Sequence, residues 1–329
     1  HRKDVITNRS LYELRQAKER GHIVEGLIVA IANIDEVIEI IKKSENSKVA
    51  ADKLCERNWS ASTIKPLLDK LGINDYKDGR NFPFKKNVSR LSPHLHHGEI
   101  SPNTVWYEVK EKSETMDSYR NGDHYLSELG WREFSYNLLY FFSYLPEENL
   151  QKKFDNFPWD DNQELLTKWQ KGLTGYPIVD AGMRELWETG YMHNRLRMVV
   201  GSFLVKNLLI HWNHGERWFW DCLIDADMAS NSASWQWVAG SGADAAPYFR
   251  IFNPIMQGQK FDPDGSYTKK YIPELANVPL KYLFNPWDAP KSILDESGVT
   301  LGKDYPYPIV NMQESRDLAL DAFDTIRIK

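Results

Sequence analysis

Two arginines and an asparagine open the stretch YMHNRLRMVVGSFLVKNLL, residues 191–209. Asn194, Arg195 and Arg197 fall within one or two adjacent helical turns, and a strongly apolar continuation follows them. An arginine side chain binds carboxylates and phosphates through a planar fork of donors. The stretch therefore predicts either an anion-binding site or, taken alone, the polar end of a buried helix.

A second polar group lies in LIDADMASNSASWQW, residues 223–237. Asp225 and Asp227 could ligate a metal ion, but no third oxygen ligand stands at the spacing of a calcium loop, so we expect no metal there. A carboxylate beside Arg197 would instead form a buried ion pair. Asn231 offers both a donor and an acceptor, which suits the edge of a heteroaromatic ring.

Hydroxyl and basic groups precede a predicted helix in NVSRLSPHLHHGEIS, residues 87–101. Ser92 is the predicted N-cap, with Pro93 in the first helical turn. Together with Ser89, Arg90 and the positive end of the helix, it would make a phosphate seat. A capped loop that binds no ligand is the alternative. Three histidines follow, but no carboxylate or cysteine joins them at a convincing spacing, so we expect no metal.

Aromatic side chains are abundant, with 12 Trp, 16 Tyr and 14 Phe in the chain. Many of them stand in WQWVAGSGADAAPYFRIFNP, residues 235–254, beside a Gly-Ser-Gly-Ala stretch and the lone Arg250. Such a run is either a corner of the core or a site where rings stack on a flat ligand while the arginine holds an anion. Trp159, Trp212 and Trp235 lie in three different segments, so they act together only if the fold gathers them.

Hydrophobic periodicity predicts an all-α protein in two parts. Residues 1–55 carry no Trp or Pro, and they show apolar positions at helical spacing after a capping box at Ser10–Glu13. A further helix is expected from Asp35. Residues 56–329 contain helical runs such as ELGWREFSYNLLYFF and LRMVVGSFLVKNLLIHW, and no series of alternating strands interrupts them.

Bulk composition limits the class of protein. The net charge of −5 gives no global basic field, so any nucleic-acid site must be a local patch. Cys55 and Cys222 are too few for a disulfide framework, which fits a reducing compartment. The longest apolar run, Leu27–Ala32, is too short to span a bilayer, and no signal peptide is visible. We therefore expect a cytoplasmic protein without membrane contact.

From about Trp59 to its end, the chain resembles the flavin-binding domain of DNA photolyases and the related cryptochromes. The motifs that carry the resemblance stand in the family's order: NDYKDGRNFP, SRLSPHLHHGEISP, ELGWREF, WQKGLTGYPIVDAGMRELWETGYMHNRLRM, FLVKNLLIHW, LIDADMASNSASWQW and GADAAPYFRIFNP. Met198 after Arg197, and Asn231 before the WQW unit, are most similar to microbial class I cyclobutane pyrimidine dimer photolyases.

This resemblance implies a photolyase-type helical domain that repairs cyclobutane pyrimidine dimers in damaged DNA, driven by light. Repair would be the work of FAD in its reduced form, which gives an electron to the flipped-out dimer. The alternative is a cryptochrome-like receptor for blue light, which would keep the flavin pocket without repair activity. A monomer is expected.

The resemblance also implies roles for the residues that match the family's motifs. The cofactor-binding residues would be Tyr76, Ser89, Arg90, Leu91, Ser92, Tyr125, Glu128, Asn194, Arg197, Phe219, Asp225, Asp227 and Asn231. The lesion and the DNA phosphates would be contacted by Arg80, Trp131, Arg132, Asn194, Arg195, Met198, Trp237 and Arg250. The catalytic set would be Glu128 facing cofactor and lesion, Asn231 at the flavin N5, and an electron-transfer series of Trp235, Trp212 and Trp159.

The front of the chain departs from this family. Photolyases begin with an α/β antenna domain, which has no counterpart here, so no site for an antenna chromophore is expected and FAD itself would absorb the light. Residues 1–54 instead resemble a piece of the A subunit of DNA gyrase and topoisomerase IV, near the start of its coiled-coil arm. No topoisomerase activity carries over, because the catalytic tyrosine is absent. A natural fusion, an assembly artefact and an engineered chimera all stay open as origins of this segment.

Overall fold

The computed structural model describes residues 34–56, 71–115, 119–244 and 250–327. The capping box expected at Ser10–Glu13 lies outside these residues. Within them the chain is helical and has no strand, only two isolated bridges, so the predicted all-α class is confirmed. The helical elements are α2 (Ile34–Lys42), α3 (Ser47–Glu56), η2 (Ile73–Asp75), α5 (Tyr76–Gly79), α6 (Ser92–His96), α7 (Pro102–Thr115), α8 (Tyr119–Phe141), η3 (Lys152–Asn156), α9 (Gln163–Gln170), α10 (Pro177–Thr189), α11 (Asn194–Ser202), η4 (Phe203–Asn207), α12 (Trp212–Cys222), α13 (Met228–Ala239), α14 (Pro254–Phe261), α15 (Ser266–Tyr271), η5 (Pro273–Leu275), α16 (Leu280–Leu283), η6 (Pro286–Asp288), α17 (Lys291–Glu296) and α18 (Met312–Arg327).

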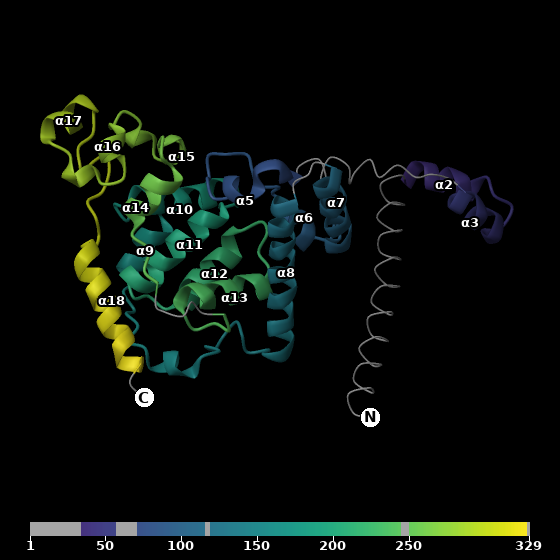
Figure 1. Ribbon diagram of the computed structural model, residues 1–329, viewed down its shortest axis with the longest axis horizontal. Coiled ribbons are helices and arrows are strands. Elements are labelled where there is room, and N and C mark those ends of the chain that lie inside the picture. The colour runs from purple at the N-terminus through teal and green to yellow at the C-terminus, as the bar shows by residue number, and fades with distance from the viewer. Residues whose placement is uncertain (1–33, 57–70, 116–118, 245–249, 328–329) are drawn as a thin grey trace.

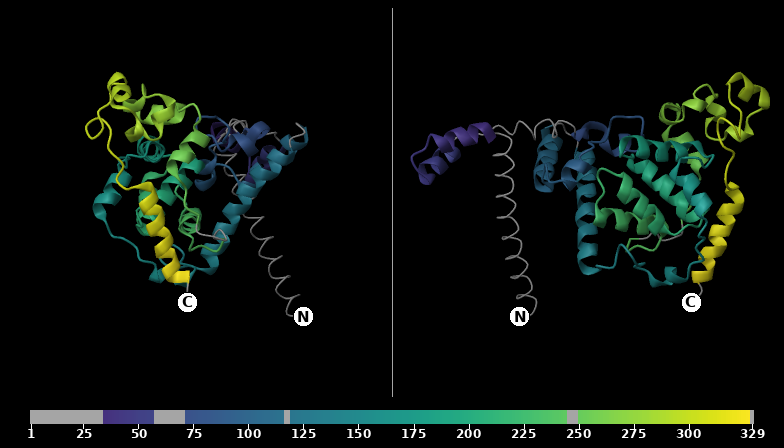
Figure 2. Two further views of the ribbon diagram at one scale, coloured as in Figure 1. Left: turned by 60° about the vertical axis from the view of Figure 1, so that its left-hand side comes forward. Right: turned by 180° about the vertical axis from the view of Figure 1, so that it is seen from behind.

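The first two described helices, α2 and α3, pack against each other and lie to one side of the remaining helices (Figures 1 and 2). Helix α2 covers the sequence IDEVIEIIK, which confirms the helix expected from Asp35. The boundary between the two predicted parts, at residue 55, stays a prediction.

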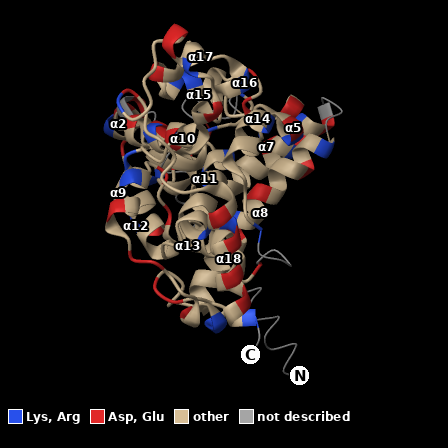
Figure 3. Cartoon of the chain, turned by 90° about the vertical axis from the view of Figure 1, so that its left-hand side faces the viewer, with Lys and Arg blue, Asp and Glu red and all other residues tan. Residues whose placement is uncertain are grey.

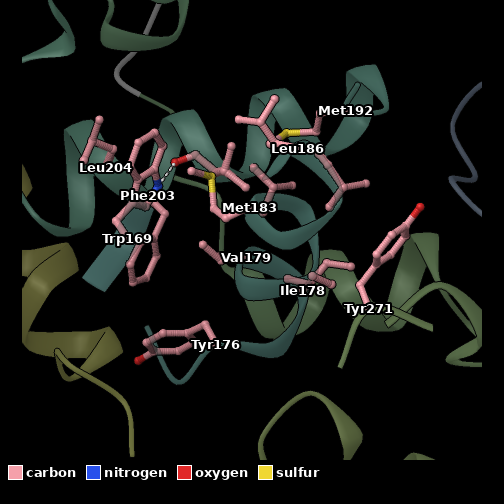
Figure 4. Close-up of a cluster of buried hydrophobic side chains, with 14 of the residues drawn as sticks. Trp169, Tyr176, Ile178, Val179, Met183, Leu186, Met192, Phe203, Leu204 and Tyr271 are labelled. Carbon is pink, nitrogen blue, oxygen red and sulfur yellow. Dashed lines mark hydrogen bonds between the residues drawn. The ribbon is translucent and has the colours of Figure 1, made fainter. Parts of the chain in front are cut away.

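A large core holds the body of the protein together. It is built chiefly by helices α9 to α13, by η4 and by the segments that follow α14. Figure 4 shows Trp169 of α9 beside Met183 of α10, Phe203 and Leu204. Trp169 is completely buried, and its indole N–H donates to the Val200 carbonyl at 3.0 Å. Since a buried polar group needs such a partner, this hydrogen bond lets the largest side chain sit in the apolar interior.

Helix α10 crosses this core with defined ends. Pro177 stands in its first turn, where a missing N–H costs nothing, and Gly190 ends it with a left-handed φ of 65°. Buried Asp180 accepts hydrogen bonds from the N–H and hydroxyl of Thr174, from the Gly175 N–H and from the Tyr305 hydroxyl. These donors satisfy the carboxyl group and fix the loop that leads into α10.

A smaller core lies between α5, α7 and the first half of α8. Tyr76, Leu91 and Tyr125 belong to it and are 7%, 1% and 4% exposed. Helix α8 also packs on α13, where the hydroxyl of Tyr136, in the second half of α8, donates to Asp227. This one long helix therefore connects both cores, as Figures 1 and 2 show.

Charged residues of both signs are spread over the helices, with acidic positions along α18 (Figure 3). This agrees with the expectation that no single-signed field covers the molecule. Among the described residues, none of the helices has the length and apolar character that crossing a membrane requires.

Candidate functional site

A cavity of about 630 Å³ lies between α8, α11, α12 and α13. Sites for small molecules and cofactors have volumes of about 300 to 1,000 Å³. The predicted site residues on its wall are Ser92, Glu128, Trp131, Arg132, Asn194, Arg197, Met198, Phe219, Asp225, Asp227, Asn231, Trp235 and Trp237. The fold therefore gathers in one place side chains that are far apart in the sequence.

An ion pair fixes one part of this wall. The Arg197 guanidinium, on the first turn of α11, donates to both carboxylate oxygens of Asp225 at 3.0 and 2.8 Å. Its Nε donates to the Met192 carbonyl at 2.8 Å. The Asp225 side chain is only 3% exposed, so its charge depends on this partner. The predicted ion pair is confirmed, and its role toward a cofactor stays a prediction.

Ser92 ties the loop before α6 to the same carboxylate. Its hydroxyl donates to Asp225 Oδ2 at 2.5 Å. Helix α6 begins at Ser92, with Leu91 as the N-cap, so the predicted N-cap at Ser92 is wrong by one residue. The physical reason is that this hydroxyl is used by Asp225 and makes no capping hydrogen bond.

Asp227 is the N-cap of α13, where its Oδ1 accepts from the Ser230 N–H at 2.8 Å. Its Oδ2 accepts from the hydroxyl of Tyr136 on α8, and His96 Nδ1 lies 3.4 Å away. Burial acts to raise the pKa of Asp227, but the hydrogen bonds from Tyr136 and Ser230 hold it below its ordinary value. The wall therefore keeps a second negative charge at neutral pH.

Asn231 stands on α13 with its side chain almost fully buried. Its Nδ2 donates to the Glu216 carbonyl on α12 at 2.9 Å, and this bond orients the amide group. The carboxyl group of Glu216 accepts from the Ser232 hydroxyl at 2.9 Å. Burial raises the pKa of Glu216. The amide of Asn231 is thus fixed in the wall of the cavity, as a group that recognises a ring edge would need to be.

The opposite wall comes from α8. Glu128 lines the cavity and pairs with Arg80, whose side chain is 13% exposed. Trp131, one turn further along, is half-exposed. Met198 lies across from them on α11, where Arg195 Nη1 approaches its sulfur at 3.9 Å. This part of the cavity is open, aromatic and flanked by arginines.

Positive charge concentrates near the start of α11. His193, the N-cap of α11, is buried, and its Nδ1 accepts from the Arg195 N–H at 3.2 Å. Burial, together with the nearby Arg195, Arg197, Arg80 and Arg90, lowers its pKa to about 4. The pKa of Arg195 is lowered by burial and by Arg80 and Arg250. Guanidinium groups so close together favour an anionic ligand such as phosphate.

Five predicted cofactor residues stand behind or beside this wall. Tyr76 and Tyr125 have ring centroids 4.7 Å apart, and the Tyr125 and Ser89 hydroxyls are hydrogen-bonded at 2.9 Å. The Leu91 side chain belongs to the small core, so only its backbone could contact a ligand. Arg90 is exposed, with its guanidinium 4.6 Å from the Tyr191 ring centroid.

The three predicted electron-transfer tryptophans differ in burial and in what they contact. Trp235 lines the cavity and is 3% exposed, and its ring lies against Gly215 of α12. Trp212 starts α12 three residues before this glycine, on the same side of the helix. Trp212 is completely buried, whereas Trp159 is partly exposed. An electron-transfer role for these three residues stays a prediction.

Arg250 is exposed and begins the segment that leads to α14. Two groups of the helix formed by α11 and η4 hold this segment. The Ser202 hydroxyl accepts from the Phe252 N–H at 3.2 Å, and the Lys206 ammonium donates to the Arg250 carbonyl. Lys206 stands in a π-helical turn, is 4% exposed, and has its pKa lowered by burial and by Arg250 to about 7.

Replacing Lys206 with methionine is expected to flatten the pH dependence of stability between about pH 7 and 9. The folded protein binds the Lys206 proton more weakly than the unfolded chain does, so the free energy of unfolding rises with pH there. One such group contributes up to about 1.4 kcal/mol per pH unit. Urea unfolding at several pH values measures the slope. Lys168→Met, on the exposed face of α9, should keep the wild-type slope; equal slopes for the Lys206 variant would contradict the expectation.

Several residues of the site were not predicted from sequence. Gly215 gives Trp235 its place, Tyr136 bonds Asp227, and Glu216 holds Asn231 through its backbone. The sequence did contain a sign that Lys206 is unusual. It stands inside the apolar run FLVKNLL, where a lysine would be buried in the helix without water around its ammonium group. No such sign marks Gly215 and Tyr136, because their roles depend on partners far away in the chain.

Taken together, the fold and site define a helical domain with a cofactor-sized cavity. Buried amide, carboxylate and guanidinium groups suit a flat heteroaromatic ring, and the arginines near α11 suit a phosphate. The donors and acceptors on the wall thus fit a flavin nucleotide. Among the described residues, no three His, Cys, Asp or Glu side chains come together as a metal site would require.

Comparison with models of known protein families identifies the family of this domain. Residues 125–325 match the model of the FAD binding domain of DNA photolyase. The chain belongs to this family. Residues 1–92 match the model of the A subunit of DNA gyrase/topoisomerase IV, a match that extends past the predicted resemblance of residues 1–54.

Known relatives are similar over most of this chain. A deoxyribodipyrimidine photo-lyase of Agrobacterium fabrum is 52% identical over 79% of the chain and 55% of its own length. A class III photolyase structure from Agrobacterium tumefaciens superposes with a TM-score of 0.78 at 50% identity, covering 82% of this chain and 55% of that one. Cryptochrome-2 of Arabidopsis thaliana is 38% identical over 88% of the chain and 49% of its own length. The chain thus spans about half the length of the relatives it matches.

Proposed function

We propose that this protein repairs cyclobutane pyrimidine dimers in damaged DNA by a light-driven, FAD-dependent reaction. The observation that carries the proposal is that the cavity has two different sides, one buried and polar and the other open and aromatic. Its buried side has the Arg197–Asp225 pair and Asn231, while its open side has Glu128 and Trp131 beside arginines. A flavoprotein that only senses light has no need of the open aromatic side.

Bound FAD would supply a one-electron donor that blue light excites once the flavin is reduced. In our proposal Arg197, Asp225 and Asn231 hold the ring, and Asp227 and Asn194 line its surroundings. Ser89, Arg90 and Ser92, with the Leu91 backbone, hold the phosphate and ribose side, beside the aromatic rings of Tyr76 and Tyr125. Phe219 closes the apolar part of the wall.

The open side of the cavity would receive the lesion. A dimer has lost planarity and base pairing, so flipping it out of the duplex costs less than flipping an undamaged base. Trp131, Trp237 and Met198 would pack on it, and Glu128 would accept hydrogen bonds from its edge. The DNA phosphates would be held by Arg80, Arg132, Arg195 and Arg250, contacts that position the duplex without reading its sequence.

The photolyase class within this proposal rests on similarity. Met198 and Asn231 favoured class I, but the solved relative at 50% identity is a class III photolyase, which favours that class. The second candidate function is a cryptochrome-like receptor, supported by the similarity to Cryptochrome-2. A cytoplasmic location and a monomeric state remain predictions.

The proposal is tested with an oligonucleotide that carries one thymine dimer, added to FAD-loaded, reduced protein. We expect the two thymines to be recovered in blue light and not in darkness. Bound FAD without recovery would favour the receptor function. Protein that takes up no FAD would contradict both functions.

Replacing Glu128 with alanine is expected to lower the yield of repair per absorbed photon by about 10-fold to 100-fold, the worth of a hydrogen bond to a charged group. FAD should stay bound, because the Arg197–Asp225 pair is untouched. Repair yield and the flavin absorption spectrum measure the two effects. Glu164→Ala, at an exposed carboxylate of α9, is the control that should repair normally. An unchanged yield in Glu128→Ala would refute the role of Glu128.

A further inference from the structure

The residue before Trp212 contacts two of the three tryptophans in the proposed electron-transfer series. His211 is the N-cap of α12. Its imidazole centroid lies 5.4 Å from that of Trp212 at an interplanar angle of 30°, and 4.9 Å from that of Trp159 at 69°. One ring is thus stacked on the inner indole and meets the outer indole edge-on. This contact joins a residue that starts α12 to one in the loop before α9.

Hydrogen bonding fixes the orientation and tautomer of His211. Its Nδ1 accepts from the Asn213 N–H at 3.2 Å, so the proton of the neutral ring is on Nε2. Burial, together with His214 and Arg217 and against the opposing effect of Asp155, lowers the pKa of His211 to about 4. At neutral pH the imidazole is therefore uncharged. A neutral ring does not oppose a positive charge on either indole, and it keeps the capping hydrogen bond.

The two indoles are themselves held in different ways. The Trp212 N–H donates to Asn149 Oδ1 at 2.8 Å. Trp159 packs on Phe157, with ring centroids 4.4 Å apart, and its buried N–H has no hydrogen-bond partner among the described residues. Trp212 is therefore held by a polar side-chain contact, whereas the indole of Trp159 is held by packing among the described residues. His211 supplies one of the ring contacts of Trp159.

We propose that His211 is a positioning residue for electron transfer from Trp159 to Trp212. This inference rests on the proposed function, because repair needs reduced FAD, and oxidised FAD in blue light would take its electron first from Trp235, then from the other tryptophans of the predicted series. When Trp212 has passed an electron to Trp235, one electron leaves Trp159 and restores Trp212, so Trp159 becomes the oxidised residue. An added thiol then returns an electron to Trp159. His211 gains and loses neither electron nor proton; its ring holds the two indoles in contact.

Two variants separate the ring of His211 from its capping role. His211→Asn keeps a side-chain acceptor that can cap α12 but removes the aromatic ring. His211→Phe keeps a ring but loses the cap. In FAD-loaded, oxidised protein, a flash of blue light should give a long-lived radical on Trp159. Transient absorption spectroscopy would detect this radical and measure its lifetime. We expect this radical to be lost in His211→Asn and retained in His211→Phe.

Near-ultraviolet circular dichroism and urea unfolding of the same samples report the placement of the indoles and the stability. We expect His211→Asn to change the aromatic dichroism more than His211→Phe does, although the asparagine variant keeps the N-cap of α12. If His211→Asn forms the Trp159 radical like wild type, or if the radical is lost only in proportion to stability, the inference is wrong. The wild type gives the full yield of the Trp159 radical, and Trp212→Phe, which interrupts the series, gives the yield expected when no electron leaves Trp159. A wild type that forms no tryptophan radical would contradict the proposed electron-transfer series itself, and the inference with it.

Discussion

Replacing Gly215 with alanine is expected to destabilise the protein and to displace the indole of Trp235. A Cβ at position 215 would lie 2.2 Å from the six-membered part of that ring, closer than any real contact. Trp235 is 3% exposed and packs against Trp169 and Phe219, so its indole could shift only toward the cavity that it lines. Overpacking of a filled core costs about 1–3 kcal/mol and sometimes more. Urea unfolding measures the loss.

The control for this prediction is Gly130→Ala on α8. Gly130 is also helical, but an added Cβ there would meet nothing within 4 Å. Alanine is favoured over glycine in an open helix by about 0.5–1 kcal/mol, so this variant should be slightly more stable than wild type. Opposite signs for the two glycines are the expected result. A Gly215→Ala protein as stable as Gly130→Ala would show that α12 and α13 are not packed as described.

Replacing Arg197 with methionine is expected to have the second large effect. It would leave the buried Asp225 carboxylate with the Ser92 hydroxyl as its remaining side-chain donor among the described residues. Removing one partner of a buried ion pair costs about 3–5 kcal/mol, because the other charge stays buried without compensation. The free energy of unfolding at pH 7 should fall by this amount, and FAD should be lost.

Two further variants test the cause. Arg197→Met combined with Asp225→Asn should recover part of the stability, because the uncompensated charge is gone. Arg316→Met removes an arginine whose ion pair with Asp317 is half-exposed, and such a pair contributes about 0–1 kcal/mol. Equal losses for Arg197→Met and Arg316→Met would mean that the charge of Asp225 is not buried in solution.

The helical class could be predicted for local reasons, whereas the residues found on the cavity wall were predicted from the family resemblance. Periodic apolar positions and caps decide helices, so the helix from Asp35 and the runs that became α8, α10 and α11 could be predicted. The pairing of Arg197 with Asp225, 28 residues apart, followed from a family motif rather than from any local pattern.

What the sequence did not predict depends on three-dimensional packing. The continuous run LRMVVGSFLVKNLLIHW divides into α11, a π-helical turn and a short non-helical link before α12, in which Leu209 has a φ of 54°. His211 therefore caps a new helix instead of lying inside one. Nothing near Gly215 in sequence indicates that a tryptophan from the next helix will lie on it. Likewise, Ser92 serves Asp225 rather than its own helix because the two meet only in the folded chain.

The cavity is lined by residues of the large core and by Ser92, which follows Leu91 of the smaller core, and this has a consequence for how the molecule unfolds. Residues around Tyr76, Leu91 and Tyr125 form one cluster, and the helices from α9 onward form another. Among the described residues, polar contacts such as those of Ser92 with Asp225 and His97 with the Ile224 carbonyl cross between them. A ligand filling the cavity would add its contacts to both sides and stabilise only the state in which they are joined. The flavin-loaded protein is therefore expected to melt in one cooperative transition, whereas the flavin-free protein would lose the smaller cluster first, at a lower temperature.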